Sequence, residues 1–175
     1  MDISLRTSYH APLPDVLTLL LSEELAHARA QALHVANFSF TQEQPEPAVI
    51  QSVMRARVPA SELPANVRGF LSGGLGAVVT SSYHRERTPA VIEYTIRIDG
   101  APVNGALTLT LTPADELSTA SAAGTSIAAT DGQIAGSFSV NVPFIGGKIE
   151  RTAAAHANTV LTADTALVNS LLAKH

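Results

Sequence analysis

The sequence predicts an α+β fold in which a curved antiparallel sheet of about seven strands wraps around one long C-terminal helix. Two observations predict it. Several segments alternate between apolar and polar residues, which gives a strand one apolar and one polar face and is typical of antiparallel sheets. The segment from Gly146 to Leu172 instead repeats apolar residues at helical spacing, and only this segment is long enough to cover the apolar face of such a sheet.

The first third of the sequence predicts the order strand, helix, helix, strand, strand. Alternating runs indicate strands at Met1–Tyr9, Val35–Thr41 and Val49–Val58. Asp15 is expected to cap a short helix that ends at Leu21. Ser22, which is followed by two glutamates, is expected to cap a second helix that runs to about Leu33.

The remaining alternating runs predict four more strands, at Ala77–Arg87, Val91–Asp99, Ala106–Thr112 and Ile134–Val142. The inward face is clearest in Val91–Asp99, where Ile92, Tyr94 and Ile96 share one side. The inward face of Ala77–Arg87 is ambiguous. A small, polar segment predicts a loop that leads into the last strand near Thr125. Gly132 and Gly136 are expected to bend or bulge that strand. Residues 61–74 predict a helical turn capped by Ser61.

The composition excludes several classes of protein. Hydrophobic residues make up 46 % of the 175-residue chain and charged residues 15 %, which is typical of a globular protein. The net charge of −4 argues against a general nucleic-acid binder and against docking on anionic lipid. The absence of cysteine excludes disulfides, thiolate nucleophiles and cysteine zinc sites. Because there is no repeat or linker, we expect a single domain over residues 1–175.

We expect neither a secretory signal nor a membrane-spanning segment in this sequence. The N-terminal residues alternate in polarity and contain no apolar secretory region. The longest leucine-rich run, Val16–Leu21, is too short to span a bilayer. We therefore expect a cytoplasmic protein with no membrane insertion.

The glycine-rich segment "VNVPFIGGKIE" looks at first like a phosphate-binding loop. Such a loop requires Gly-x-x-x-x-Gly-Lys-Ser/Thr, but Val142 stands at the first glycine position and Ile149 at the last position. A structural interpretation fits better, because Pro143 ends a strand and the two glycines let the chain turn sharply. The segment therefore predicts the corner between the last strand and the long helix, and no nucleotide cofactor is expected.

Three polar residues are candidates for a site beneath the long helix. None of the six histidines has the spacing of a metal site, so no metal is expected. His156 falls within the inward stripe of the long helix, and Asp164 lies near the other edge of that stripe. Tyr94 lies on the apolar face of its strand, where its hydroxyl needs a partner. The simpler interpretation of His156 is a residue at the core edge that hydrogen-bonds to a carbonyl.

The order of these elements resembles the START-like, helix-grip superfamily, which includes polyketide cyclases and lipid-transfer proteins, over essentially the whole chain. Three segments, "LPANVRGFLSGGLGAVV", "GAPVNGALTLTLTP" and "VPFIGGKIE", are similar to a small bacterial family of unknown function within that superfamily. The chain departs from this family at Tyr83, in the region where the family usually has a tryptophan. The resemblance implies a pocket between the sheet and the long helix, but it implies no catalytic residues.

These observations favour a binder of a small apolar or amphipathic molecule, without cofactor and without an assigned catalytic residue. Phe70 is expected to flank the pocket mouth, because helical caps at this point often act as gates in the superfamily. The first alternative is a cyclase or dehydratase that uses Tyr94, His156 or Asp164, and the second is a protein-interaction module with a filled core. The oligomeric state stays open. The expected pocket wall consists of Met54, Tyr94, Ile96, Leu107, Leu109, Phe138, His156 and Val160.

Overall fold

The computed structural model describes residues 2–35, 37–62, 68, 73–99, 103–114, 128–140 and 146–175. The side chains of residues 62, 103, 140 and 146–157 are not described. The elements follow the order β1 (Asp2–Tyr9), α1 (Leu13–Leu20), α2 (Glu23–Ala32), β2 (Asn37–Glu46), β3 (Val49–Val58), a 3-10 turn (Ala60–Glu62), β4 (Leu75–His84), β5 (Ala90–Asp99), β6 (Val103–Pro113), β7 (Thr130–Val140) and α4 (Gly146–Leu172).

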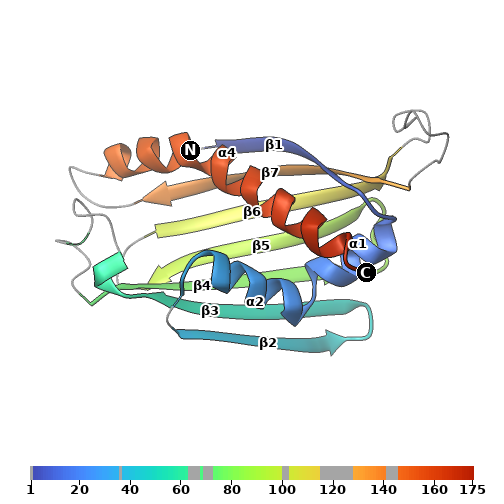
Figure 1. The fold of residues 1–175 in the computed structure, drawn as a ribbon, viewed down its shortest axis with the longest axis horizontal. Coiled ribbons are helices and arrows are strands. Elements are labelled where there is room, and N and C mark those ends of the chain that lie inside the picture. The colour runs from blue at the N-terminus through green and yellow to red at the C-terminus, as the bar shows by residue number, and fades with distance from the viewer. Residues whose placement is uncertain are drawn as a thin grey trace.

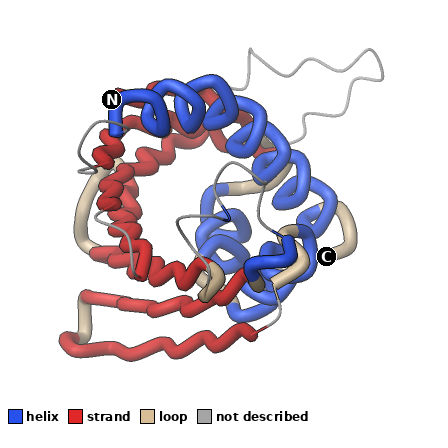
Figure 2. Tube along the Cα trace, turned by 90° about the vertical axis from the view of Figure 1, so that its left-hand side faces the viewer, coloured by secondary structure: helices blue, strands red, loops and turns tan. Residues whose placement is uncertain are grey.

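Within the described residues, seven strands form one antiparallel sheet in the order β1-β7-β6-β5-β4-β3-β2. The sheet curves, and α1, α2 and α4 lie on its concave side (Figure 1, Figure 2). The helix α4 contacts β1 and β7 at one end of the sheet, and α2 contacts β2 at the other. The predicted fold class, a curved sheet around a long C-terminal helix with two short helices after the first strand, is therefore confirmed.

The hydrophobic core fills one end of the concave face. Cross-strand partners point to the same side of a sheet, so the register places six inward side chains in a row across β1, β7, β6, β5, β4 and β3. Four of the six are buried, and the residues are Leu5, Ile134, Leu109, Ile92, Tyr83 and Ile50. Val16 of α1, Leu25 of α2 and Val168 of α4 pack into the same cluster, and each has no exposed surface. The three helices are thereby fixed on the sheet at this end.

Two of the predicted element boundaries that are wrong involve proline. The helix α1 begins at Leu13, with Pro12 at its N-cap, so Asp15 lies in the first turn and does not cap the helix. The ring of Pro14 fixes a helical backbone φ in the first turn, where no amide donor is needed, which explains the earlier start. The strand β2 continues past Thr41 to Glu46, because an edge strand tolerates Pro45 and a register irregularity between Glu43 and Glu46. The predicted cap at Ser22 is confirmed by its hydrogen bond from the Leu25 amide, 3.2 Å.

The expected bulge at Gly132 and Gly136 is also wrong. The pairing of β6 with β7 runs without a shift from Val103 to Pro113. Both glycines instead provide space for neighbouring groups. A Cβ atom on Gly132 would lie 2.6 Å from the Thr7 methyl group, and one on Gly136 would overlap the Ala106 carbonyl oxygen. These glycines therefore allow close packing in a regular strand.

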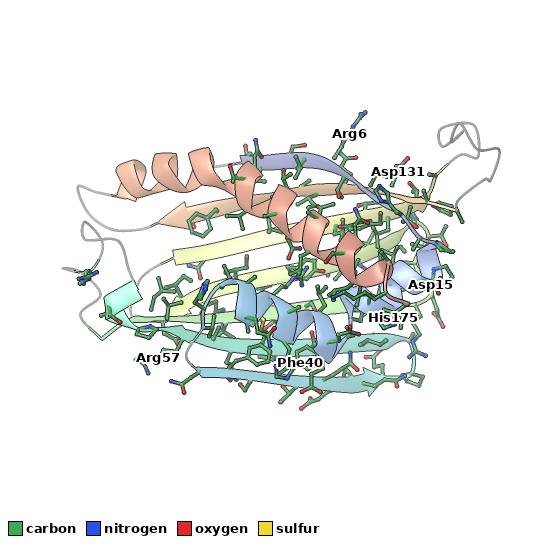
Figure 3. All side chains as sticks on the ribbon, in the orientation of Figure 1. Arg6, Asp15, Phe40, Arg57, Asp131 and His175 are labelled. Carbon is green, nitrogen blue, oxygen red and sulfur yellow. The ribbon has the colours of Figure 1, made fainter. Side chains whose placement is uncertain are left out.

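The inward and outward faces of the sheet differ in chemistry. Arg6 of β1 points away from the helices, whereas Phe40 of β2 lies beside α2 (Figure 3).

The predicted helical turn around Phe70 lies outside the described residues. No helix in the described part of the chain is long and apolar enough to cross a membrane.

Candidate functional site

A row of polar side chains crosses the middle of the concave face. The register aligns Tyr94 of β5 with Ser81 of β4 and Ser52 of β3. The two serines are buried, and their hydroxyl oxygens lie 2.7 Å apart in a hydrogen bond. This row borders the filled core on one side. On its other side the inward side chains are apolar but keep part of their surface exposed, and they are Phe40, Met54, Val79, Ile96 and Phe138.

An ion pair lies over this polar row and joins two helices. The guanidinium of Arg29 in α2 donates two hydrogen bonds to the carboxylate of Asp164 in α4, from Nε to Oδ1 at 2.7 Å and from the second terminal nitrogen to Oδ2 at 2.7 Å. The two side chains keep 25 % and 30 % of their surface exposed. Burial lowers the pKa of Arg29, but the hydrogen bonds and the charge of Asp164 outweigh this effect and raise it. Arg29 therefore stays ionised.

The hydroxyl of Tyr94 is a buried donor without a partner. It makes no hydrogen bond to any described residue, although the ring keeps part of its surface exposed. Burial raises the pKa of Tyr94, and the Arg29 guanidinium acts in the opposite direction. Arg29 is thus close enough to act on the hydroxyl oxygen, but a guanidinium has only N–H donors and offers no acceptor for the phenolic hydrogen. The phenol remains protonated and can donate to an incoming acceptor.

A second group of hydroxyls extends the polar site toward β1. The Thr7 hydroxyl donates to the Thr165 hydroxyl at 2.9 Å, which donates to the Leu161 carbonyl at 3.0 Å. Tyr9, with 2 % of its surface exposed, lies beside them. Burial raises the pKa of Tyr9 to about 12, although a hydrogen bond with Thr7 acts to lower this pKa. In contrast to the Tyr94 hydroxyl, the hydroxyls of Thr7 and Thr165 each donate a hydrogen bond.

The raised pKa of Tyr9 gives a prediction about alkaline stability. Because the folded pKa lies above the unfolded value near 10, unfolding releases a proton in this window and stability falls as the pH rises through it. We expect the free energy of unfolding to fall by about 2–3 kcal/mol between pH 10 and 12 from this group. Urea unfolding at a series of pH values measures the slope. Tyr9→Phe should flatten it, and equal slopes in both proteins would contradict the assignment.

The structure places most of the predicted wall residues on the concave face. Met54 and Ile96 stand in one cross-strand row with Val79 between them, and Phe138 occupies the same row on β7. The row also contains Gly105, where a Cβ atom would lie 3.2 Å from the Phe138 ring. The Phe138 ring therefore covers the space that this glycine leaves.

The other predicted residues lie in different surroundings. Leu107 is opposite Tyr94 in the polar row, whereas Leu109 is buried in the filled core. Val160 of α4 has 56 % of its surface exposed. His156 lies in α4, but its side chain, like the whole of Phe70, is outside the described structure. The role of these residues in a site stays a prediction.

Arg29 is the functional residue that sequence reasoning missed. A signal was present, because Arg29 stands four residues after Leu25 and three after Ala26, both of which are buried in α2. Helical spacing therefore placed a charged residue on the inward face of that helix. Asp164 was singled out, but its partner is 135 residues away in sequence and becomes visible only in the fold.

Two open grooves lie beside the central site. One of about 550 Å³ runs between the corner of α1 and α2 and strands β2 to β4, and its lining includes Leu21, Gln42 and Tyr83. The other, about 580 Å³, opens at the far end of β2, β3 and β4 and is lined by Phe38, Ala56 and Ala77 together with outward polar residues. In the part of the chain that is described, no three acidic or histidine side chains are grouped as a metal would require.

Comparison with known proteins supports the fold assignment. A family model described as "Protein of unknown function (DUF2505)" matches residues 4–172. No curated protein matches the chain in sequence.

Solved structures with similar folds come from several bacteria. The protein TTHA0849 from Thermus thermophilus has a TM-score of 0.58 at 12 % identity, covering 98 % of this chain and 99 % of that one. A conserved protein from Geobacillus kaustophilus has a TM-score of 0.58 at 13 % identity, covering 99 % and 96 %. The Zhui aromatase/cyclase from Streptomyces sp. R1128 has a TM-score of 0.55 at 13 % identity, covering 99 % and 92 %. The START-like, polyketide-cyclase type of fold is thus confirmed.

Proposed function

Since the chain belongs to the family of proteins of unknown function DUF2505, we propose its function from the site: it binds a small amphipathic molecule between the sheet and the C-terminal helix. The observation that carries this proposal is the Tyr94 hydroxyl, buried and without a partner among the described residues. An unsatisfied buried hydroxyl costs about 1–3 kcal/mol, so a ligand that supplies an acceptor gains affinity.

The apolar half of the concave face fits the rest of such a ligand. Inward side chains there are apolar yet partly exposed, in contrast to the buried row beneath α1. We infer that Met54, Ile96 and Phe138 contact the apolar body, while the polar end lies against Tyr94. Few polar groups in an apolar concave surface are typical of small-molecule sites.

Exposed apolar side chains support an entrance between α2 and α4. The Arg29–Asp164 pair and the contact of Glu24 with His175, 3.2 Å, show that the two helices run in opposite directions. Leu33 stands four residues after Arg29, and Val160 stands four residues before Asp164. Because the helices are antiparallel, both residues lie one turn beyond the ion pair in the same direction, and they are 60 % and 56 % exposed. Apolar residues at a pocket rim would favour the entry of an apolar ligand.

Binding of a neutral apolar dye tests this proposal. Nile red is expected to bind with one-to-one stoichiometry and a saturable rise in fluorescence. Met54→Trp fills the apolar half and should weaken binding by about tenfold or more. Val53→Trp is the matched control, because Val53 is adjacent on β3 but points to the opposite face. It should change the affinity by less than about twofold.

Native mass spectrometry of gently purified protein distinguishes the filled-core alternative. A co-purified adduct with the mass of a small apolar molecule supports the binder. A clean mass together with no dye uptake would contradict it and favour a protein-interaction module with a filled core.

A second candidate, a cyclase- or dehydratase-type enzyme, is favoured by the protonated Tyr94 phenol beside Arg29. Its fold likeness to an aromatase/cyclase is consistent with this candidate and carries no residue roles. Tyr94→Phe and His156→Gln separate the two functions. In a binder both variants should retain most of the affinity for a probe without an oxygen acceptor, such as naphthalene, whereas in an enzyme they should abolish turnover.

A further inference from the structure

We propose that the polar end of the ligand is an uncharged oxygen acceptor, such as a ketone, aldehyde or ester, and not a carboxylate or an amine. This inference rests on the binding function proposed above and narrows the class of ligand. It follows from the charge balance of the site and from the one buried hydroxyl that has no hydrogen-bond partner among the described residues.

The charges at the site already cancel. Arg29 gives two hydrogen bonds to Asp164, one to each carboxylate oxygen, and within the described residues these two groups are the charges that act on Tyr94. An incoming carboxylate would lose its hydration, find a guanidinium that is already neutralised and be repelled by Asp164. An incoming ammonium would meet a carboxylate whose oxygens are engaged by Arg29. Neither ion recovers the cost of leaving water.

The remaining buried polar groups include one hydroxyl with no hydrogen-bond partner at all in the described part of the chain. The hydroxyls of Thr7 and Thr165 form a chain that ends on a backbone carbonyl, and those of Ser52 and Ser81 bond to each other. Among the buried side-chain nitrogen and oxygen atoms of the described residues, only the Tyr94 hydroxyl oxygen has no partner. Because burial keeps this phenol protonated, it donates one hydrogen bond. A neutral oxygen satisfies it without bringing charge into the site.

Three probes that share one apolar body test this inference. They are naphthalene, 2-acetylnaphthalene and 2-naphthoate, compared near neutral pH by displacement of Nile red. One neutral hydrogen bond corresponds to about 3–10-fold in affinity. We expect 2-acetylnaphthalene to bind about 3–10-fold more tightly than naphthalene, and 2-naphthoate to bind more weakly than both.

Two variants assign the selectivity to named groups. Tyr94→Phe should reduce the affinity for 2-acetylnaphthalene to that for naphthalene while leaving naphthalene itself unchanged. Asp164→Asn leaves the charge of Arg29 uncompensated, so the affinity for 2-naphthoate should rise by about tenfold. These opposite changes distinguish a direct electrostatic effect from a general loss of packing.

The outcomes separate this inference from the proposed function. If none of the three probes binds and Nile red is not taken up, the binding function itself is contradicted. If naphthalene binds but wild-type protein holds 2-naphthoate as tightly as the ketone, only the inference is overturned. An unchanged affinity of Tyr94→Phe for the ketone would overturn it as well.

Discussion

Asp164→Asn is expected to lower the free energy of unfolding by about 2–3 kcal/mol. The change removes the negative charge that compensates Arg29 and weakens the two hydrogen bonds that tie α2 to α4. The cost stays below that of a fully buried pair because both side chains keep a quarter or more of their surface exposed. Urea unfolding measures the difference, and a loss below about 0.5 kcal/mol would show that the pair acts as an ordinary surface salt bridge.

A double replacement is the control for this effect. Arg29→Met together with Asp164→Leu replaces both charged groups by apolar side chains, so no uncompensated charge remains. We expect this variant to unfold within about 1 kcal/mol of the wild type. The ion pair would then be retained for the ligand and not for stability. If the double variant is as unstable as Asp164→Asn, the loss comes from packing instead.

Gly136→Ala is expected to destabilise the protein by about 3 kcal/mol, because the added methyl group meets backbone atoms that cannot move aside. A Cβ atom at this position would overlap the Ala106 carbonyl oxygen and lie 2.8 Å from the Leu107 Cα atom on the neighbouring strand. Relief of this contact would require β6 and β7 to separate. Thermal or urea unfolding measures the loss.

Gly73→Ala provides the matched control for this substitution. A Cβ atom at Gly73 meets no heavy atom within 4 Å. The same chemical change should therefore alter the free energy of unfolding by less than about 0.5 kcal/mol. Comparable losses in the two variants would show that the cost arises from the chain conformation of glycine and not from strand packing.

Local pattern was sufficient to predict most of the fold. Alternation placed Ile92, Tyr94 and Ile96 on one face, and the structure confirms this face through their cross-strand partners. The long helix spans Gly146–Leu172 as its spacing predicted. The error at Asp15 has a local cause, because a proline starts the helix earlier. The errors at Thr41 and at the β7 glycines share another cause, because neighbouring strands, absent from the local pattern, decided how a proline or glycine was used.

The polar site was only partly predictable. Tyr94 and Asp164 could be found because each interrupts an apolar stripe of its own element. Their connection through Arg29 could not, because three elements distant in sequence meet only after the sheet has curved. The predictions for Phe70, for the His156 side chain, for cytoplasmic location and for a single domain stay predictions.

The irregular end of β2 has a consequence for contacts between copies of the protein. This strand pairs only with β3 in the described sheet, so its other edge carries unpaired backbone groups to which a second chain could add a strand. Pro45 has no amide hydrogen to offer, the register breaks between Glu43 and Glu46, and both glutamates would repel an identical edge. The register stays regular from Asn37 to Glu43. The same residues that lengthened β2 beyond its predicted end thus protect the protein against edge-to-edge aggregation.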